Sequence, residues 1–272
     1  MINLKHVTIT GADNSAPIEK LVELSERFPD TEWGILFSKK HEDAPRFPSS
    51  YWVADLVKAV NDIIERNKDP KNPKQIPMKL SAHLCGRDWV RNVVSQTKAE
   101  GAPEGLVRGW FEDRKEFVAA FQRIQFNFHA EDIELHDDFF KLLQEYPDKE
   151  FIFQFDGKNE SILDKFKEYG LTNAVALFDV SGGRGIVPDA WPAHNGELCG
   201  YAGGLGPDNL TEQLAAIEAV VGDKPIWIDM ETKVRSDNDA VFDMNKVLLA
   251  LTAAVDYRQP PMIDEEDDLQ IA

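Results

Sequence analysis

Cysteine is scarce in this chain of 272 residues, which contains only Cys85 and Cys199. Two cysteines are too few for a disulfide framework, and since each sits in an apolar run, we expect buried free thiols. Basic residues are outnumbered as well, because 30 lysines and arginines face 48 aspartates and glutamates, for a formal net charge of -18. Nucleic acids and anionic membranes are bound through clustered Lys and Arg, so neither is an expected partner.

Long hydrophobic runs are also missing. No window approaches eighteen consecutive apolar residues, and the N-terminal stretch MINLKHVTITG has no basic segment followed by a long apolar run. We therefore expect neither a membrane span nor a signal peptide, and a cytoplasmic location. Residues 264–268 are all carboxylates, so residues 259–272 are expected to form a solvated acidic tail after a folded body of residues 1–258.

Short β-rich runs alternate with segments of helical spacing along the chain, a pattern typical of a parallel sheet built from β/α units. The eight runs are Leu4–Thr10, Glu32–Phe37, Met78–Leu84, Arg123–Phe128, Glu150–Phe155, Ala174–Asp179, Leu198–Ala202 and Pro225–Asp229. Helical spacing covers Pro17–Phe28, Asp132–Tyr146 and Ala240–Val255, and Asn67–Pro77 is expected as an exposed loop.

Eight β/α units predict a single-domain α/β fold, the (β/α)8 or TIM barrel. The alternative is a doubly wound open sheet, which would carry a GxGxxG fingerprint after its first strand. This chain has TGADNS at that place, so the barrel is favoured.

The stretch YAGGLGPDN, Tyr201–Asn209, is suited to binding a phosphate. Gly203 and Gly204 have no Cβ, so the backbone can approach a ligand closely, and the helix expected after Pro207 offers unpaired N–H groups and a positive dipole end. The simpler alternative is a tight turn between strand and helix. The position at the end of the seventh strand favours an anion site, because phosphate sites of this barrel usually lie there.

In such a barrel the chemistry lies where strands give way to helices, and the strand ends of this chain are rich in polar residues. These residues are Thr10, His83, Cys85, Asn127, His129, Asp156, Asp179, Asp229 and Glu231. Asp179 is the leading catalytic candidate, because a carboxylate between the apolar run AVALF and the loop SGGRG would be partly desolvated, and desolvation raises the pKa of an acid. Alternatively, Asp179 only accepts hydrogen bonds from Gly182 and Gly183.

Asp229 ends the eighth strand, in IWIDMETKVR. If that strand continues, Glu231, Lys233 and Arg235 alternate onto the same side. The two cations could then bind an anionic ligand, or they could pair with the carboxylates.

Histidine and cysteine residues suggest two further chemistries. His83 and His129 leave open a divalent metal at the barrel mouth, although a hydrogen-bonded wall histidine is the simpler interpretation, and we expect neither a metal nor another cofactor. A serine or cysteine nucleophile has little support, because no GxSxG elbow is present and Cys85 has no obvious basic partner.

Together these segments resemble phosphoribosylanthranilate isomerase, a (β/α)8 enzyme that converts an aminoaldose phosphate into its ketose isomer. The similar segments are HVTITGADN, WGILFS followed by ARFPS, QFNFH, LFDVSGGRG followed by DAW, and AGGLGPDN. The resemblance implies that Asp179 is the catalytic aspartate, that Arg46 binds the substrate carboxylate, and that His129 ends the fourth strand at the site. It also implies phosphate contacts from Gly203 and Gly204, with Gly183 in the glycine-rich loop before them.

Two departures from that family affect the expected chemistry. The family's catalytic cysteine, its general base, is replaced by Thr10, and a neutral hydroxyl cannot take a proton unaided. On the eighth strand, Glu231, Thr232 and Lys233 replace small residues that complete the phosphate site, and Glu231 would repel a dianion unless Lys233, Arg235 or Arg184 offsets its charge.

The resulting hypothesis is an isomerase of this kind, acting by acid/base proton transfer on a small phosphorylated or carboxylated metabolite. Asp179 and Thr10 occupy the catalytic positions, and the substrate-binding residues are Arg46, His129, Arg184 and Asp229. Two alternatives stay open: a non-catalytic protein that binds a small anion, and a metal-assisted epimerase or lyase. The expected partner is a small anionic metabolite, and a homo-oligomer is left open.

Overall fold

The computed structural model of the protein describes residues 1–38, 40–85, 119–127, 137–155, 160–179 and 184–258. Eight parallel strands close into a barrel, in which β1 pairs with both β2 and β8. The strands are β1 Asn3–Thr10, β2 Thr31–Phe37, β3 Lys79–Cys85, β4 Arg123–Asn127, β5 Glu150–Phe155, β6 Ala174–Phe178, β7 Cys199–Ala202 and β8 Pro225–Met230. The predicted (β/α)8 fold is therefore confirmed, and each predicted strand agrees with an observed one to within a residue at either end.

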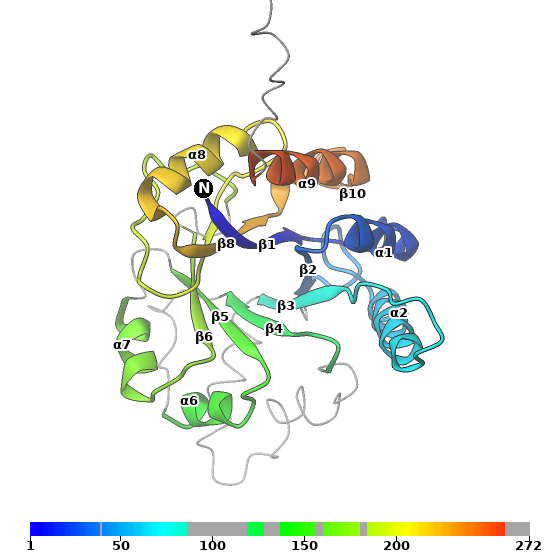
Figure 1. The fold of residues 1–272 in the computed structure, drawn as a ribbon, viewed down its shortest axis with the longest axis horizontal. Coiled ribbons are helices and arrows are strands. Elements are labelled where there is room, and N and C mark those ends of the chain that lie inside the picture. Colours follow the sequence, from blue (N-terminus) through cyan, green and yellow to red (C-terminus); the bar gives the residue numbers. More distant parts are fainter. Residues whose placement is uncertain (39, 86–118, 128–136, 156–159, 180–183, 259–272) are drawn as a thin grey trace, which may run out of the picture.

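The described helices lie outside the ring of strands (Figure 1). They are α1 Ile18–Arg27, α2 Ser50–Lys68, α6 Asp137–Gln144, α7 Glu160–Glu168, α8 Leu210–Val221 and α9 Met244–Arg258. α1 confirms the predicted helix Pro17–Phe28, and α6 lies within the predicted Asp132–Tyr146, of which residues 132–136 lie outside the described part. None of the described helices is long and apolar enough to cross a membrane.

The helices form because each places an apolar stripe against the barrel. In α2, Val53, Leu56 and Val60 are buried on one face. Its N-terminus is capped by Ser49, whose side chain accepts a hydrogen bond of 3.2 Å from the Trp52 N–H, and such a cap satisfies one of the free donors of the first turn.

The alternation that depended on a longer eighth strand does not occur, and the helix predicted after it is present but starts later. The strand ends at Met230, and a 3-10 helix η2, Thr232–Val234, follows it, so Glu231, Lys233 and Arg235 do not alternate along a strand. The predicted helix Ala240–Val255 begins only at Met244, because β10, Val241–Phe242, pairs antiparallel with β9, Arg235–Ser236.

Polar groups occupy part of the barrel interior. Glu32 is 1% exposed, and its carboxylate accepts hydrogen bonds from Thr8 Oγ1 at 2.8 Å and Arg123 Nη1 at 3.0 Å. Arg123 also lies over the ring of Trp227, 4.2 Å from its centroid. Burial opposes ionisation of Glu32, but the Arg123 cation holds the pKa of that carboxyl below its usual value.

Gly34 on β2 makes room for two polar side chains in the same interior. A Cβ at this position would lie 2.1 Å from Thr10 Oγ1 and 3.0 Å from the His83 ring. Since real Cβ atoms do not approach other atoms so closely, glycine here allows Thr10 and His83 to point into the barrel.

Candidate active site

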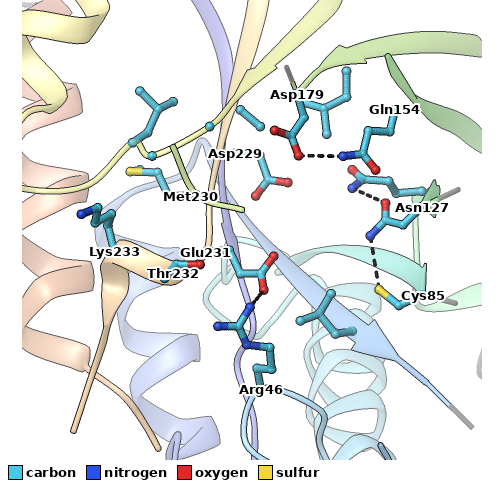
Figure 2. A pocket seen from close by; sticks show the side chains of 18 of the residues that line it. Arg46, Cys85, Asn127, Gln154, Asp179, Asp229, Met230, Glu231, Thr232 and Lys233 are labelled. Atoms are coloured by element: carbon cyan, nitrogen blue, oxygen red, sulfur yellow. Dashed lines mark hydrogen bonds and ion pairs between the residues drawn. The ribbon is translucent and has the colours of Figure 1, made fainter. Parts of the chain in front are cut away.

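A cavity of about 260 Å³ opens where the strands end at their carboxyl side (Figure 2). Strand ends and the loops after them supply its lining: Leu36, Arg46, Phe47, Cys85, Gln125, Asn127, Gln154, Leu177, Asp179, Gly185, Ala202, Gly203, Gly204, Leu205, Asp229, Met230, Glu231, Thr232 and Lys233. This is the end of the barrel at which (β/α)8 enzymes carry their active sites. It brings together five residues predicted for the site: Arg46, Asp179, Gly203, Gly204 and Asp229.

Asp179 follows the end of β6 and is 6% exposed. Gln154 on β5 donates a hydrogen bond of 2.6 Å to Asp179 Oδ2, and the Asp179 N–H donates to the Phe155 carbonyl at 3.0 Å. The carboxylate is therefore held by the neighbouring strand while it faces the cavity. The alternative role predicted for it involved Gly182 and Gly183, which lie outside the described residues.

Asp229 near the end of β8 is 8% exposed and lies between Asp179 and Glu231 in Figure 2. Thr10 Oγ1 donates a hydrogen bond of 2.6 Å to its Oδ1. Burial is the largest influence on this carboxyl and, with the nearby carboxylates Glu231, Glu32 and Asp179, raises its pKa to about 8, although the Thr10 hydroxyl acts in the opposite direction.

A line of amide and thiol groups forms the wall beside these carboxylates. Gln125 Nε2 donates to Asn127 Oδ1 at 2.8 Å, and Asn127 Nδ2 contacts Cys85 Sγ at 3.2 Å. Burial raises the pKa of the Cys85 thiol to about 12, so this thiol is neutral and is no nucleophile at neutral pH. Cys85 and Cys199 are both free, as predicted, but only Cys199 is fully buried, because Cys85 is partly exposed at the cavity.

Arg46 lines the cavity but is bound to two carboxylates. Its Nη1 pairs with Glu231, its Nε donates a hydrogen bond of 2.8 Å to Asp239 Oδ2, and its Nη2 forms an ion pair with Asp239 Oδ1 at 2.6 Å. The Arg46 backbone is in the left-handed region with φ of 68°, and its N–H donates to Asp13 Oδ2 at 2.6 Å. A substrate carboxylate that binds Arg46 must therefore displace or share one of these partners.

Arg235 ties the loops after β1 and β8 together beneath Arg46. Its side chain is fully buried, donates to Asp13 Oδ2 at 2.6 Å and to the Asp239 carbonyl at 2.9 Å, and also pairs with the Gly11 carbonyl. Because this guanidinium is enclosed by protein groups, Arg235 stabilises the site and is not an open cation for a ligand.

The glycine pair after β7 has a backbone shape that other residues rarely adopt, with φ of 123° at Gly203 and 60° at Gly204. A Cβ at either residue would lie within 3 Å of the backbone at Ile186 or Val187. Close packing of this turn therefore requires glycine at both positions, and both glycines also line the cavity. α8 begins at Leu210, three residues after Pro207, so the backbone groups nearest the cavity belong to the loop.

Lys233 lies next to this turn. A Cβ at Gly206 would be 2.3 Å from the Lys233 Cβ, so the η2 segment approaches the glycine loop closely. Figure 2 shows Lys233 at the opposite end of the cavity lining from Asn127 and Gln154. An exposed lysine beside a glycine turn gives this end of the cavity a positive charge.

The remaining predicted residues are placed differently. Thr10 is 1% exposed and reaches the site through Asp229, since it is not part of the described cavity lining. Arg184 is exposed and likewise does not line the cavity. Gly183, His129 and Asp156 lie outside the described residues.

Sequence reasoning missed Gln154 and Asp239. Gln154 alternates inward on a strand already predicted, whereas Asp239 sits in a loop with no recognisable signal.

His83 does not reach the cavity lining. It is 1% exposed inside the barrel, and burial lowers its pKa to about 4, so its imidazole is neutral. Among the residues that the structure describes, no group of three or more His, Cys, Asp or Glu could hold a metal ion. A metal-assisted mechanism therefore gains no support from this part of the chain.

Comparison with solved structures shows the same fold in phosphoribosylanthranilate isomerase. The Thermotoga maritima enzyme matches with 12% identity and a TM-score of 0.52 over 94% of this chain and 100% of that one. A monomeric form generated from the dimeric Thermotoga maritima enzyme matches with 14% identity and a TM-score of 0.50, over 94% and 99%.

A third match is phosphoribosylanthranilate isomerase in complex with reduced 1-(o-carboxyphenylamino)-1-deoxyribulose 5-phosphate, with 14% identity, a TM-score of 0.51, and coverage of 94% and 100%. No protein-family model and no curated protein matches the chain. At these identities the similarity defines the class of fold, a (β/α)8 barrel like that of phosphoribosylanthranilate isomerase.

Proposed function

We propose that the protein is an isomerase of the aldose–ketose type, which acts on a small phosphorylated or carboxylated metabolite by acid/base proton transfer. One observation carries the proposal: a single cavity at the carboxyl end of the barrel holds two buried carboxyl groups, Asp179 and Asp229, beside the glycine turn Gly203–Gly204. Two carboxyl groups in different surroundings are a common means of supplying an acid and a base.

Asp179 is the proposed general acid. Its carboxyl is held in place by Gln154, which leaves it facing the cavity, and a fixed geometry is what proton transfer requires. The glycine turn and Lys233 are the proposed contacts for the anionic group of the substrate, since backbone N–H groups and a lysine together suit a phosphate. Similarity of fold to phosphoribosylanthranilate isomerase supports a ligand of this class.

A second candidate is a non-catalytic protein that binds a small anion in the same cavity. The observation that favours it is Thr10, which occupies the position of the catalytic cysteine in the resemblance and donates a hydrogen bond to Asp229. Such a protein would hold its ligand without changing it.

The test is to incubate the protein with phosphoribosylanthranilate and with ribose 5-phosphate, and to analyse the recovered sugar phosphates by mass spectrometry and chromatography. We expect a ketose product from at least one of them, and a loss of about 100-fold or more in kcat for Asp179→Asn. Asp208→Asn, the same change at an exposed carboxylate on the same loop as the glycine turn, is the matched control. Tight binding with complete recovery of unchanged ligand would favour the binding protein instead.

A further inference from the structure

Thr10 and Asp229 form a buried pair where the barrel interior meets the cavity. Parallel pairing of β1 with β8 places Thr8 opposite Asp229, and the Thr10 hydroxyl then donates to Asp229 Oδ1 at 2.6 Å. Asp229 lines the cavity, whereas Thr10 is 1% exposed and lies behind it. Of the two, only the carboxylate borders the space in which a ligand would sit.

The hydroxyl of Thr10 is not itself a base in this arrangement. Its hydroxyl hydrogen is engaged in the hydrogen bond to Asp229. The pKa of an aliphatic hydroxyl in water is also far too high for it to ionise near neutral pH and act as a base. Gly34 on the neighbouring strand β2 packs closely against this hydroxyl. The position that resembles the family's base has therefore become a hydrogen-bond donor to the carboxylate of β8.

We propose that Asp229 is the general base of the isomerisation and that Thr10 is its positioning residue. The inference rests on the proposed function and completes it, because Asp179 as acid requires a base within the same cavity. The acid and the base then come from β6 and β8, and the hydrogen bond from Thr10 fixes one carboxylate oxygen.

The surroundings of Asp229 suit this role. Charged and titratable groups face it from several elements: Glu32 and Arg46 from β2 and its loop, Cys85 from β3, Asp179 from β6, and Glu231 with Lys233 from the segment after β8. This set contains the three carboxylates Glu32, Asp179 and Glu231, and the charge of its arginine, Arg46, is already offset by ion pairs. Together with burial they raise the pKa of Asp229 to about 8, and a carboxylate of that pKa is a far stronger base than an exposed one.

The reaction balances with these two groups alone. For ribose 5-phosphate in its open-chain form, Asp229 takes the proton from the carbon next to the carbonyl carbon, the C–H electron pair becomes the C=C bond of an enediol, and Asp179 gives a proton to the carbonyl oxygen. In the second half, Asp229 returns its proton to the former carbonyl carbon and Asp179 accepts the proton of the neighbouring hydroxyl. One carbon is oxidised and its neighbour is reduced within the same molecule, so no external oxidant or reductant is needed.

The experiment compares Asp229→Asn, Thr10→Val, Thr10→Ser and the control Asp208→Asn. The mechanism needs one proton in the cavity, which must lie on Asp179 when Asp229 acts as the base. For the wild-type protein we therefore expect kcat/KM for phosphoribosylanthranilate or ribose 5-phosphate to fall as pH rises through about 8, because Asp229 then loses the proton that the acid would have to give. Asp229→Asn should lower kcat by about 100-fold or more. Its affinity for reduced 1-(o-carboxyphenylamino)-1-deoxyribulose 5-phosphate, measured by calorimetry, should change by only about threefold, because a base acts on proton transfer more than on binding.

The Thr10 hydroxyl stabilises the ionised form of Asp229. Thr10→Val removes this hydrogen-bond donor, so the pH midpoint should move upward. Thr10→Ser keeps a hydroxyl and should hold the midpoint near 8. If Asp229→Asn keeps kcat within about tenfold of the wild type while Asp179→Asn abolishes it, the base lies elsewhere and this inference is overturned, but the proposed function stands. If the wild-type protein converts neither sugar phosphate, the proposed function fails and the role of Asp229 fails with it.

Discussion

Arg46 shows at the scale of one residue how the protein's own carboxylates control what the cavity can bind. Its guanidinium meets Glu231 and both oxygens of Asp239, so its charge is neutralised within the chain. The resemblance to phosphoribosylanthranilate isomerase implies that this arginine binds a substrate carboxylate. In the structure the carboxylate of Glu231 already occupies the position beside Arg46 that a substrate carboxylate would take.

Glu231→Gln should therefore strengthen the binding of a carboxylated ligand. The substitution removes one negative charge from the cavity and releases Arg46 Nη1, so the affinity for reduced 1-(o-carboxyphenylamino)-1-deoxyribulose 5-phosphate should rise by about tenfold in calorimetry at low salt. Glu212→Gln, an exposed change on α8, is the control and should have no effect. An unchanged or weaker affinity for Glu231→Gln would show that Arg46 does not contact this ligand.

Asp229 also makes the stability of the fold depend on pH. Its pKa is about 8 in the folded protein and near 3.8 when unfolded, so between these values the folded state holds a proton that the unfolded state releases. Stability contributed by this carboxyl is fully present below pH 3.8 and is lost as pH rises through 8. Asp229→Asn should thus stabilise the protein by about 5 kcal/mol at pH 8 and have little effect near pH 4.

Urea denaturation at both pH values measures this difference, with Asp208→Asn as the control at an exposed site. Asparagine can still accept the hydrogen bond from Thr10, so the comparison isolates the charge. A variant that is less stable than the wild type at pH 8 would contradict the assignment of a raised pKa to Asp229.

At the scale of single elements, the strands were predictable and their contacts across the barrel were not. Alternation of short β-rich runs with helical segments located β1 to β8, because burial of each strand imposes an apolar composition that the sequence displays. The predicted start of α9 lies four residues before the observed start at Met244. Val241 fits the apolar stripe of a helix, but it belongs to the short strand β10, which pairs with β9.

The site residues divide in the same way. Asp179 and the glycine turn stand at strand ends and could be found from the sequence. The hydrogen bond between Thr10 and Asp229 joins residues 219 apart, and that between Arg46 and Asp239 joins residues 193 apart. Such pairs depend on barrel closure and loop conformation, which no local pattern reports.

The buried ion pair between Glu32 of β2 and Arg123 of β4 should matter for stability. Arg123→Met removes the cation that lies 3.0 Å from the buried Glu32 carboxylate, and an uncompensated buried charge should cost about 3 to 5 kcal/mol of unfolding free energy. Adding Glu32→Gln to that variant should recover a large part of the loss. Arg66→Met, at an exposed position of α2, is the control, and equal effects of Arg66→Met and Arg123→Met in denaturant unfolding would refute this interpretation.

For the whole molecule, closure of β1 onto β8 is what makes a site from scattered residues. It brings the first strand, with Thr10, to the last, with Asp229, which lines the same cavity as Asp179 and the glycine turn. The chain has a formal net charge of -18, so an anionic metabolite must be bound by local groups against the general field of the protein. We propose that Lys233 and the backbone of the glycine turn do so.

Proton NMR in heavy water measures whether this cavity moves protons on a small anionic sugar derivative. Ribose 5-phosphate or phosphoribosylanthranilate is incubated with a catalytic amount of the protein, and the signal of the hydrogen on C2 of the ribose is followed over time. The account predicts that this signal decays with the wild-type protein and persists with Asp179→Asn and Asp229→Asn. A ligand that binds the wild-type protein, keeps this signal undiminished and is recovered unchanged would contradict the account.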